Sequence, residues 1–181
     1  QRRLVLALDL PFVETHISYV LFDRGTAYKI KKAVAFPFLD FTALDAREFY
    51  CHEELRLNGR LAPSIYQDVV AITGTPDAPV IGGEGRPIEF AVRMRKFDQA
   101  GLLSRVIERD ELTTERVDAV AAAVADFHEK TAVAGSDSPY GEPDAIIRNA
   151  RDNFDEMEGA EAVSAWTERE GRRLQDLFLA R

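Results

Sequence analysis

The sequence predicts an α+β fold in which a small sheet-containing lobe is followed by a helical lobe. Short β-branched and alternating segments lie almost entirely before residue 97, and apolar residues with a helical period dominate after it. Residues 1–96 are expected to form an antiparallel sheet of about five strands with one helix. Residues 97–181 are expected to form a partial, all-helical lobe.

Composition restricts the class of protein before any motif is considered. The 181 residues are 46% hydrophobic and 30% charged, as in soluble globular proteins. The net charge of -8 argues against a nucleic-acid or anionic-membrane surface. Cys51 is the single cysteine, which excludes an internal disulfide and fits a reducing compartment. We therefore expect a cytoplasmic protein that binds neither nucleic acid nor membrane.

The first strands are indicated by short apolar segments separated by turn residues. Residues 1–10 are ambiguous between a short helix and a first strand. Residues 12–14 and 19–22 read as two strands joined by a tight polar turn. A turn around Gly25 leads into a third strand, so residues 12–33 are expected to form an antiparallel meander.

A helix is expected over residues 43–60. Thr42 is in position to cap it, with Asp45 three residues later completing a capping box. Its apolar stripe is predicted to consist of Phe49, Tyr50, Leu57 and Leu61.

The remaining strands are expected between the helix and residue 96. Residues 69–72 are short and β-branched, and residues 74–79 read as a turn. Residues 80–81 and 88–94 are expected to pair with each other, with the glycine-rich stretch 82–85 as the hairpin turn.

Helices are expected throughout the second lobe. Leu102 to Ile107 forms a short amphipathic segment, and Thr113 is expected to cap the next helix. Two more helices are predicted at about 143–158 and 160–180. The helix after Thr113 is expected to be the core of this lobe because its apolar residues recur three and four apart, at Val117, Val120, Val124 and Phe127.

The third strand carries the most informative pattern, Ala27-Tyr28-Lys29-Ile30-Lys31-Lys32. Because side chains alternate along a strand, Ala27, Lys29 and Lys31 share one face. A lysine in the middle of a strand is costly to bury unless it meets an anion. Lys29 therefore becomes the first candidate for an anion-binding residue.

The following helix supplies two carboxylates for this lysine. Glu54 is the preferred partner of Lys29, and Glu53 remains the alternative because the helix phase is uncertain by one residue. Lys29 and either acid could also be surface charges, and a solvated edge-strand lysine is a common device against aggregation. Lys31 and Lys32 are interpreted as surface charges.

The order of strands, helix, strands, connector and helices is that of the nucleotide-binding lobe of protein-kinase-like folds. Ala27 to Ile30 has the Ala-x-Lys-Ile pattern of the phosphate-holding strand. Over residues 12–130 the chain resembles the bacterial aminoglycoside phosphotransferase-like predicted kinases. The segments that carry this resemblance are 14–18, 27–32, 38–41, 53–58, 60–63 and 91–95.

The resemblance implies roles for particular residues around a nucleotide. Lys29 would contact the α- and β-phosphates as a point charge, with Glu54 positioning it. The phosphate-covering turn would be formed by Thr15, His16 and Ser18, through backbone N–H and hydroxyl donors.

The segment between the two lobes would bind the base. The backbone of the connector from Met94 through Arg95 to Phe97 would hydrogen-bond an adenine, and Phe97 or Leu102 would wall its pocket. The implied cofactor is ATP, or another nucleoside triphosphate, with Mg²⁺ in the intact protein. The implied partners are this nucleotide and an unknown small-molecule acceptor. Many similar proteins continue into a C-terminal P-loop domain, and the oligomeric state is open, a homodimer included.

The sequence departs from the resemblance at the catalytic loop. Members of this group place a catalytic residue in a His-Gly-Asp-type loop after the core helices, but His16, His52 and His128 are not followed by Gly-Asp. That loop would begin at about Arg181, so we assign no catalytic residue and no metal ligand. The chain is expected to be the nucleotide-binding fragment of a phosphotransferase. The alternative is an inactive kinase-like module that regulates or binds a partner.

These 181 residues are expected not to transfer phosphate on their own, because no residue is assigned to the catalytic or metal-binding roles. The measurement is a phosphotransferase assay with ATP and a panel of acceptors. Turnover that depends on Mg²⁺ would refute this expectation.

Overall fold

The structure is a computed structural model, and it describes residues 1–135, 138, 142–158 and 173. The chain divides into two compact units, Gln1–Glu129 and Lys130–Arg181. The expected boundary after Lys96, between a sheet-containing lobe and a helical lobe, does not coincide with this division and stays a prediction.

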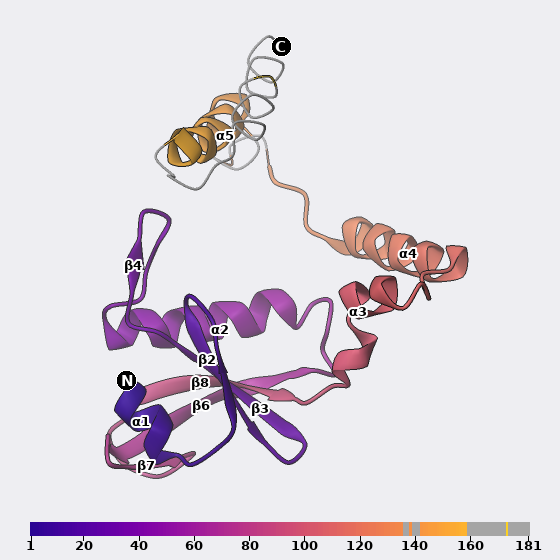
Figure 1. Cartoon of the computed structure of the whole chain (residues 1–181). Helices are drawn as coiled ribbons and strands as arrows, with labels where there is room; N and C mark the ends of the chain where they lie inside the picture. The colour runs from indigo at the N-terminus through magenta and orange to yellow at the C-terminus, as the bar shows by residue number, and fades with distance from the viewer. Residues whose placement is uncertain (136–137, 139–141, 159–172, 174–181) are drawn as a thin grey trace. The chain divides into compact units, whose positions relative to one another are not determined.

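A six-stranded antiparallel sheet dominates the first unit (Figure 1). Its strand order is β1-β2-β3-β8-β6-β7, and a separate hairpin follows β3. The fold is therefore α+β, and the predicted meander over residues 12–33 is confirmed. The strands are β1 Phe12–Glu14, β2 Ser18–Asp23, β3 Thr26–Lys31, β4 Ala35–Phe36, β5 Leu39–Asp40, β6 Tyr66–Thr75, β7 Ala78–Ile81 and β8 Glu89–Arg95.

The expected hairpin between residues 80–81 and 88–94 is wrong. Strand β7 pairs with β6, whereas β8 lies between β3 and β6 and pairs with both. Strand β6 has 10 residues, long enough to carry β7 and β8 on its two edges. The predicted turn over 74–79 shortens accordingly, since β6 continues to Thr75 and β7 begins at Ala78. Inserting β8 in the sheet satisfies its backbone groups on both sides.

The helices agree with most of the predicted ranges. Their bounds are α1 Arg2–Ala7, α2 Leu44–Asn58, the 3₁₀ helix η1 Gln99–Gly101, α3 Leu103–Glu108, α4 Thr114–Lys130 and α5 Pro143–Glu158. The ambiguous N-terminal stretch is thus helical. The Thr113 hydroxyl accepts a 3.4 Å hydrogen bond from the Arg116 N–H, as expected of a cap. The predicted helix at 160–180 falls outside the described residues.

Each face of the sheet packs against a different helix. On one face, Tyr19, Leu21 and Ile30 form a buried cluster with Leu4 and Val5 of α1. On the other face, Phe90 and Val92 pack with Cys51 of α2, which lies along the sheet in Figure 1. Because Ile30 faces α1, its neighbours Lys29 and Lys31 must face α2.

The expected apolar stripe of α2 does not form the buried face. Phe49 is 57% exposed and Leu61 is 60% exposed, while Arg47 and Cys51 are the buried residues of the helix. The covered sheet face carries two lysines, so a helix packed on it must bring charge-compensating groups. The apolar residues of the sequence pattern therefore remain at the surface.

The predicted capping box of α2 is also wrong. Ala43 occupies the N-cap position and makes no side-chain capping hydrogen bond. The Thr42 hydroxyl instead donates to Asp40, and Asp45 accepts from the Ala46 N–H. Asp40, the last residue of β5, competes with the helix N-terminus for the Thr42 side chain. It accepts hydrogen bonds from both the hydroxyl and the N–H of Thr42.

Helix α4 has the predicted period but not the predicted core role. Val117, Val120 and Val124 are between 44% and 55% exposed, and no residue of the helix is buried. The guanidinium group of Arg60 does lie over Phe127, with its Cζ 5.1 Å from the centre of the ring. A helical period predicts local structure, whereas burial needs an opposing surface.

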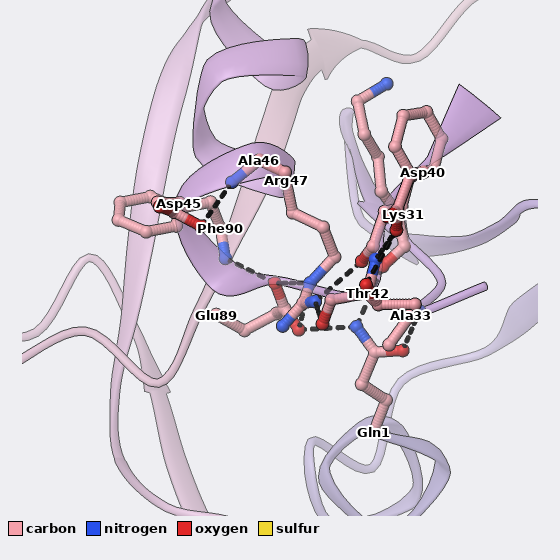
Figure 2. Close-up of polar contacts among 11 residues, drawn as sticks. Gln1, Lys31, Ala33, Asp40, Thr42, Asp45, Ala46, Arg47, Glu89 and Phe90 are labelled. Atoms are coloured by element: carbon pink, nitrogen blue, oxygen red, sulfur yellow. Dashed lines mark hydrogen bonds and ion pairs between the residues drawn. The ribbon is translucent and has the colours of Figure 1, made fainter. Parts of the chain in front are cut away.

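A buried ion pair ties the start of α2 to the start of β8 (Figure 2). The Arg47 Nε donates to Glu89 Oε1 and Oε2 at 2.9 and 3.1 Å, and its Nη1 donates to the carbonyls of Phe41 and Thr42, both at 2.8 Å. Gln1 donates through Nε2 to Glu89 Oε2 at 2.5 Å. These directional contacts determine where the N-terminal end of α2 sits on the sheet.

Within the described ranges, no helix is both long enough and apolar enough to cross a membrane.

Replacing Arg47 with Met is expected to lower the free energy of unfolding by about 3–5 kcal/mol, because Glu89 would be left buried without its counter-charge. The matched control is Arg56→Met, which removes an exposed pair with Glu53 and is expected to cost less than about 1 kcal/mol. Urea denaturation of both variants measures the difference. Equal losses would contradict the role given to Arg47.

Candidate functional site

Two lysines of β3 share one carboxylate of α2. Lys29 Nζ lies 2.8 Å from Glu54 Oε1, and Lys31 Nζ lies 2.7 Å from Glu54 Oε2. We call these three side chains the Glu54 cluster. With two ammonium groups and one carboxylate, the cluster keeps an excess positive charge.

The two lysines differ in their access to solvent. The Lys31 side chain is 6% exposed, and its Nζ lies 5.1 Å from the centre of the Phe41 ring. The Lys29 side chain is 29% exposed, and Glu54 is 10% exposed. Lys31 is therefore enclosed by protein, while Lys29 can meet a ligand that arrives from solvent.

The pKa values of Glu54 and of the neighbouring Cys51 thiol are shifted from their ordinary values. Burial pushes the pKa of Glu54 upward, but the hydrogen bonds and charges of Lys29 and Lys31 outweigh burial and hold that pKa below 4.5. Burial raises the pKa of the Cys51 thiol to about 11. Glu54 is thus a stable carboxylate at neutral pH, and Cys51 is an unreactive thiol packed beside the cluster.

Regular backbone geometry brings these groups together. Lys29 and Lys31 are two residues apart and point to the same face of β3. On α2, Arg47, Cys51 and Glu54 are spaced by four and three residues, which places them on one side of the helix. The side of α2 that faces the sheet is therefore polar at both ends and apolar in the middle.

A pocket of about 250 Å³ opens on the same face of the sheet. Ala27 lines it and lies two residues from Lys29 along β3, a separation of about 7 Å. Cross-strand pairing places Val20 opposite Lys29 and Met94 opposite Ala27. The complete lining is Val13, Val20, Phe22, Ala27, Met94, Arg95, Lys96, Phe97 and Gln99.

The segment after β8 forms one wall of this pocket. The Arg95 N–H donates to the Ile65 carbonyl and the Lys96 N–H to the Gly25 carbonyl, both at 2.8 Å. Among the described residues, nothing hydrogen-bonds the Phe97 N–H or the Lys96 carbonyl. These two groups are the ends of one trans peptide unit and point in opposite directions, so the unit has one hydrogen-bonding group available on the side of the pocket.

The turn between β1 and β2 lies next to the C-terminal end of β3. Its Thr15 hydroxyl donates to the Ser18 carbonyl and accepts from the Ser18 N–H, at 3.1 and 3.0 Å. The Ile17 carbonyl accepts from the Lys32 N–H at 2.8 Å, and Ser18 is paired with Lys31. This places the turn beside the Glu54 cluster.

The hydroxyl roles expected in this turn need correction. Ser18 is fully buried, so its hydroxyl cannot cover a phosphate that enters from solvent. The Thr15 hydroxyl is used within the turn. His16 is exposed, and among the described residues nothing hydrogen-bonds the N–H of His16 or Ile17.

The structure brings most of the remaining predicted site residues to one face. Lys29 contacts Glu54 as expected, and the alternative partner Glu53 instead pairs with Arg56 at the surface. The predicted connector residues Met94, Arg95 and Phe97 line the pocket, whereas Leu102 does not. Whether these residues bind a nucleotide stays a prediction.

Lys31 is the important residue that sequence reasoning misinterpreted. It was expected at the surface but is 5% exposed. The signal was present, because strand alternation puts Lys31 on the same face as Lys29. Lys32, expected at the surface too, is a partly covered residue on the other face, where its Nζ lies 2.6 Å from Glu14 and 4.9 Å from the Tyr19 ring centre.

The described residues contain no group of three or more His, Cys, Asp or Glu side chains arranged to hold a metal ion.

Comparisons with known proteins give relatives without an assigned activity. The chain is 29% identical over 152 residues to uncharacterized proteins of Mycobacterium bovis and of two strains of Mycobacterium tuberculosis. The matched region covers 82% of this chain but 29% of each relative, so the chain spans less than a third of their length. No family model matches the sequence, and no solved structure matches it.

Replacing Glu54 with Gln is expected to make acid unfolding less steep below pH 4.5. The folded pKa of Glu54 lies below its ordinary value of 4.5, so its contribution to stability is complete above that pH and is lost as pH falls through the folded pKa. Free energies of unfolding measured from pH 3 to 7 give the comparison. The matched control, Glu53→Gln at the more exposed neighbouring position, is expected to change the slope less. An unchanged slope for Glu54→Gln would contradict the assignment.

Proposed function

We propose that this chain binds ATP, or another nucleoside triphosphate, as the nucleotide-binding part of a cytoplasmic small-molecule phosphotransferase of the aminoglycoside phosphotransferase-like kind. One observation carries the proposal: an apolar pocket and an accessible ion-paired lysine lie on the same sheet face, two residues apart along β3. A nucleotide needs both features at about this spacing.

The pocket suits a base rather than a complete nucleotide. Its volume of about 250 Å³ is below the roughly 300–1,000 Å³ usual for sites that enclose drug-sized ligands. Val20 and Ala27 offer apolar contacts to a flat ring. The Lys96 carbonyl and the Phe97 N–H are the two ends of one trans peptide unit and point in opposite directions, so the unit offers a base in the pocket one hydrogen bond. An adenine edge presents both an acceptor and a donor, so either end of this peptide unit would find a partner on it.

The Glu54 cluster suits the phosphates. Lys29 follows the pocket along β3, so a triphosphate extending from a base in the pocket would pass its ammonium group. The free N–H groups of His16 and Ile17 lie in the turn beside the far end of this path and could bind phosphate oxygens. Lys29 would neutralise phosphate charge, and Glu54 would hold the Lys29 side chain extended across the sheet face.

The described residues offer contacts for a base and for phosphates but no comparable site for magnesium. Since they form no cluster of acidic or histidine ligands, Mg²⁺ in the intact protein would be bound by other residues and by the nucleotide itself. No step of the proposed binding uses a protein–metal contact. The catalytic residues and the acceptor site would likewise lie in other parts of a longer protein, as the length of the mycobacterial relatives allows.

A second candidate, an inactive kinase-like module that binds a partner, is favoured by exposed aromatic residues. Phe36 and Phe38 of the β4–β5 hairpin stack with ring centres 5.7 Å apart, although they are 41% and 71% exposed. Phe49 on α2 is exposed as well. Exposed aromatic groups of this kind are common where proteins contact one another. Failure to bind any nucleotide would favour this candidate.

Replacing Lys29 with Met is expected to weaken ATP binding by about 1.5–3 kcal/mol, the range for hydrogen bonds to charged groups. Isothermal titration of the folded chain with ATP measures the loss. Lys32→Met is the matched control, because it removes an ion-paired lysine from the opposite face of the same segment and should leave the affinity unchanged.

The base pocket can be tested beside the lysine. Ala27→Leu is expected to fill the pocket and to abolish binding of both ATP and adenosine, while Lys29→Met should weaken ATP but spare adenosine, which has no phosphate. If the parent chain binds neither ligand, or if Lys29→Met binds ATP as the parent does, the proposed function is wrong.

A further inference from the structure

The sharing of Glu54 between two lysines gives Lys31 a task of its own. A single lysine paired with a single carboxylate would form a neutral unit, and a phosphate would have to compete with that carboxylate for the ammonium group. Here each lysine contacts a different oxygen of Glu54, at 2.8 Å for Lys29 and 2.7 Å for Lys31. Glu54 therefore remains paired when Lys29 turns to a ligand.

Burial distinguishes the permanent partner from the exchangeable one. Lys31 is enclosed between Glu54 and the face of Phe41, and at 6% exposure its side chain has almost no contact with solvent. Releasing Lys31 from Glu54 would leave a buried ammonium group without its counter-charge, which is strongly unfavourable. Lys29 is 29% exposed and can exchange part of its contact with Glu54 for a solvent-borne anion at much lower cost.

We infer that Lys31 is a positioning residue that acts through Glu54: it compensates the carboxylate permanently and so makes the Lys29 ammonium available to the anionic phosphates of a ligand. This inference rests on the proposed nucleotide function and extends it to a residue that does not touch the ligand. Without Lys31, Glu54 would pair with Lys29 alone, and the excess charge of the cluster would fall from +1 to zero.

The test compares ATP with adenosine on the same variants by isothermal titration. Lys31→Met is expected to bind ATP about tenfold more weakly while binding adenosine as the parent does, because only the charge facing the phosphates is lost. Lys31→Arg retains the charge and is expected to restore ATP binding. Lys32→Met is the matched control, since Lys32 also pairs with a carboxylate and lies over an aromatic ring but on the other face.

A double variant keeps the test decisive if Lys31→Met is poorly folded. Lys31→Met with Glu54→Gln removes both charges and leaves Lys29 without a competing carboxylate, so the ratio of ATP to adenosine affinity is expected to exceed that of Lys31→Met. Thermal unfolding of each variant identifies those that are folded.

The outcomes separate the two proposals. If the parent chain binds neither ATP nor adenosine, the proposed nucleotide function is overturned and this inference with it. If the parent binds ATP but Lys31→Met weakens ATP and adenosine equally, Lys31 is structural only and the inference alone is overturned. The inference is also overturned if the double variant binds ATP more weakly than Lys31→Met.

Discussion

The carboxylate of Glu54 stands between two ammonium groups in a mostly buried space, and the arrangement of the candidate site depends on it. Its contacts with Lys29 and Lys31 join β3 to α2 across the face of the sheet. In a partly buried setting such contacts are stronger than at the surface, but they also require every charge to be compensated. The lysines of β3 can face the interior only because α2 brings a carboxylate to meet them.

Helix α2 is consequently seated by polar contacts near both of its ends. Arg47 pairs with Glu89 near the N-terminus, Glu54 pairs with the lysines of β3, and Cys51 packs against the sheet between them. Apolar contacts tolerate small shifts of a helix, whereas charge-assisted hydrogen bonds have narrow distances and angles. This seating defines the position of Lys29 relative to the pocket, and hence the spacing on which the proposed nucleotide site relies.

Sequence reasoning predicted the Lys29–Glu54 pair correctly but misassigned Lys31 and the apolar residues of α2. Both the success and the errors have physical causes. The pairing of Lys29 with Glu54 followed from an alternating strand, a nearby acidic helix and the resemblance to a known group of kinases. The apolar stripe of α2 was misassigned because Phe49 and Leu61 are hydrophobic, and the expectation took no account of the charges on the face to be covered. Lys31 was assigned to the surface because a lone lysine usually lies there. Its burial depends on a counter-charge more than twenty residues away in the chain.

Local regularities in the chain were sufficient to determine the α+β class, the β1–β3 meander, the start of α4, the range of α5, and which residues of β3 share a face. These features follow from backbone geometry, which repeats every two residues in strands and every 3.6 in helices. Tertiary structure alone decided that β8 enters the sheet between β3 and β6, that α2 turns Arg47, Cys51 and Glu54 toward the sheet, and that Ser18 and Lys31 are buried. Those outcomes depend on which distant surfaces compete for the same hydrogen bonds, charges and apolar contacts, and no local period carries that information.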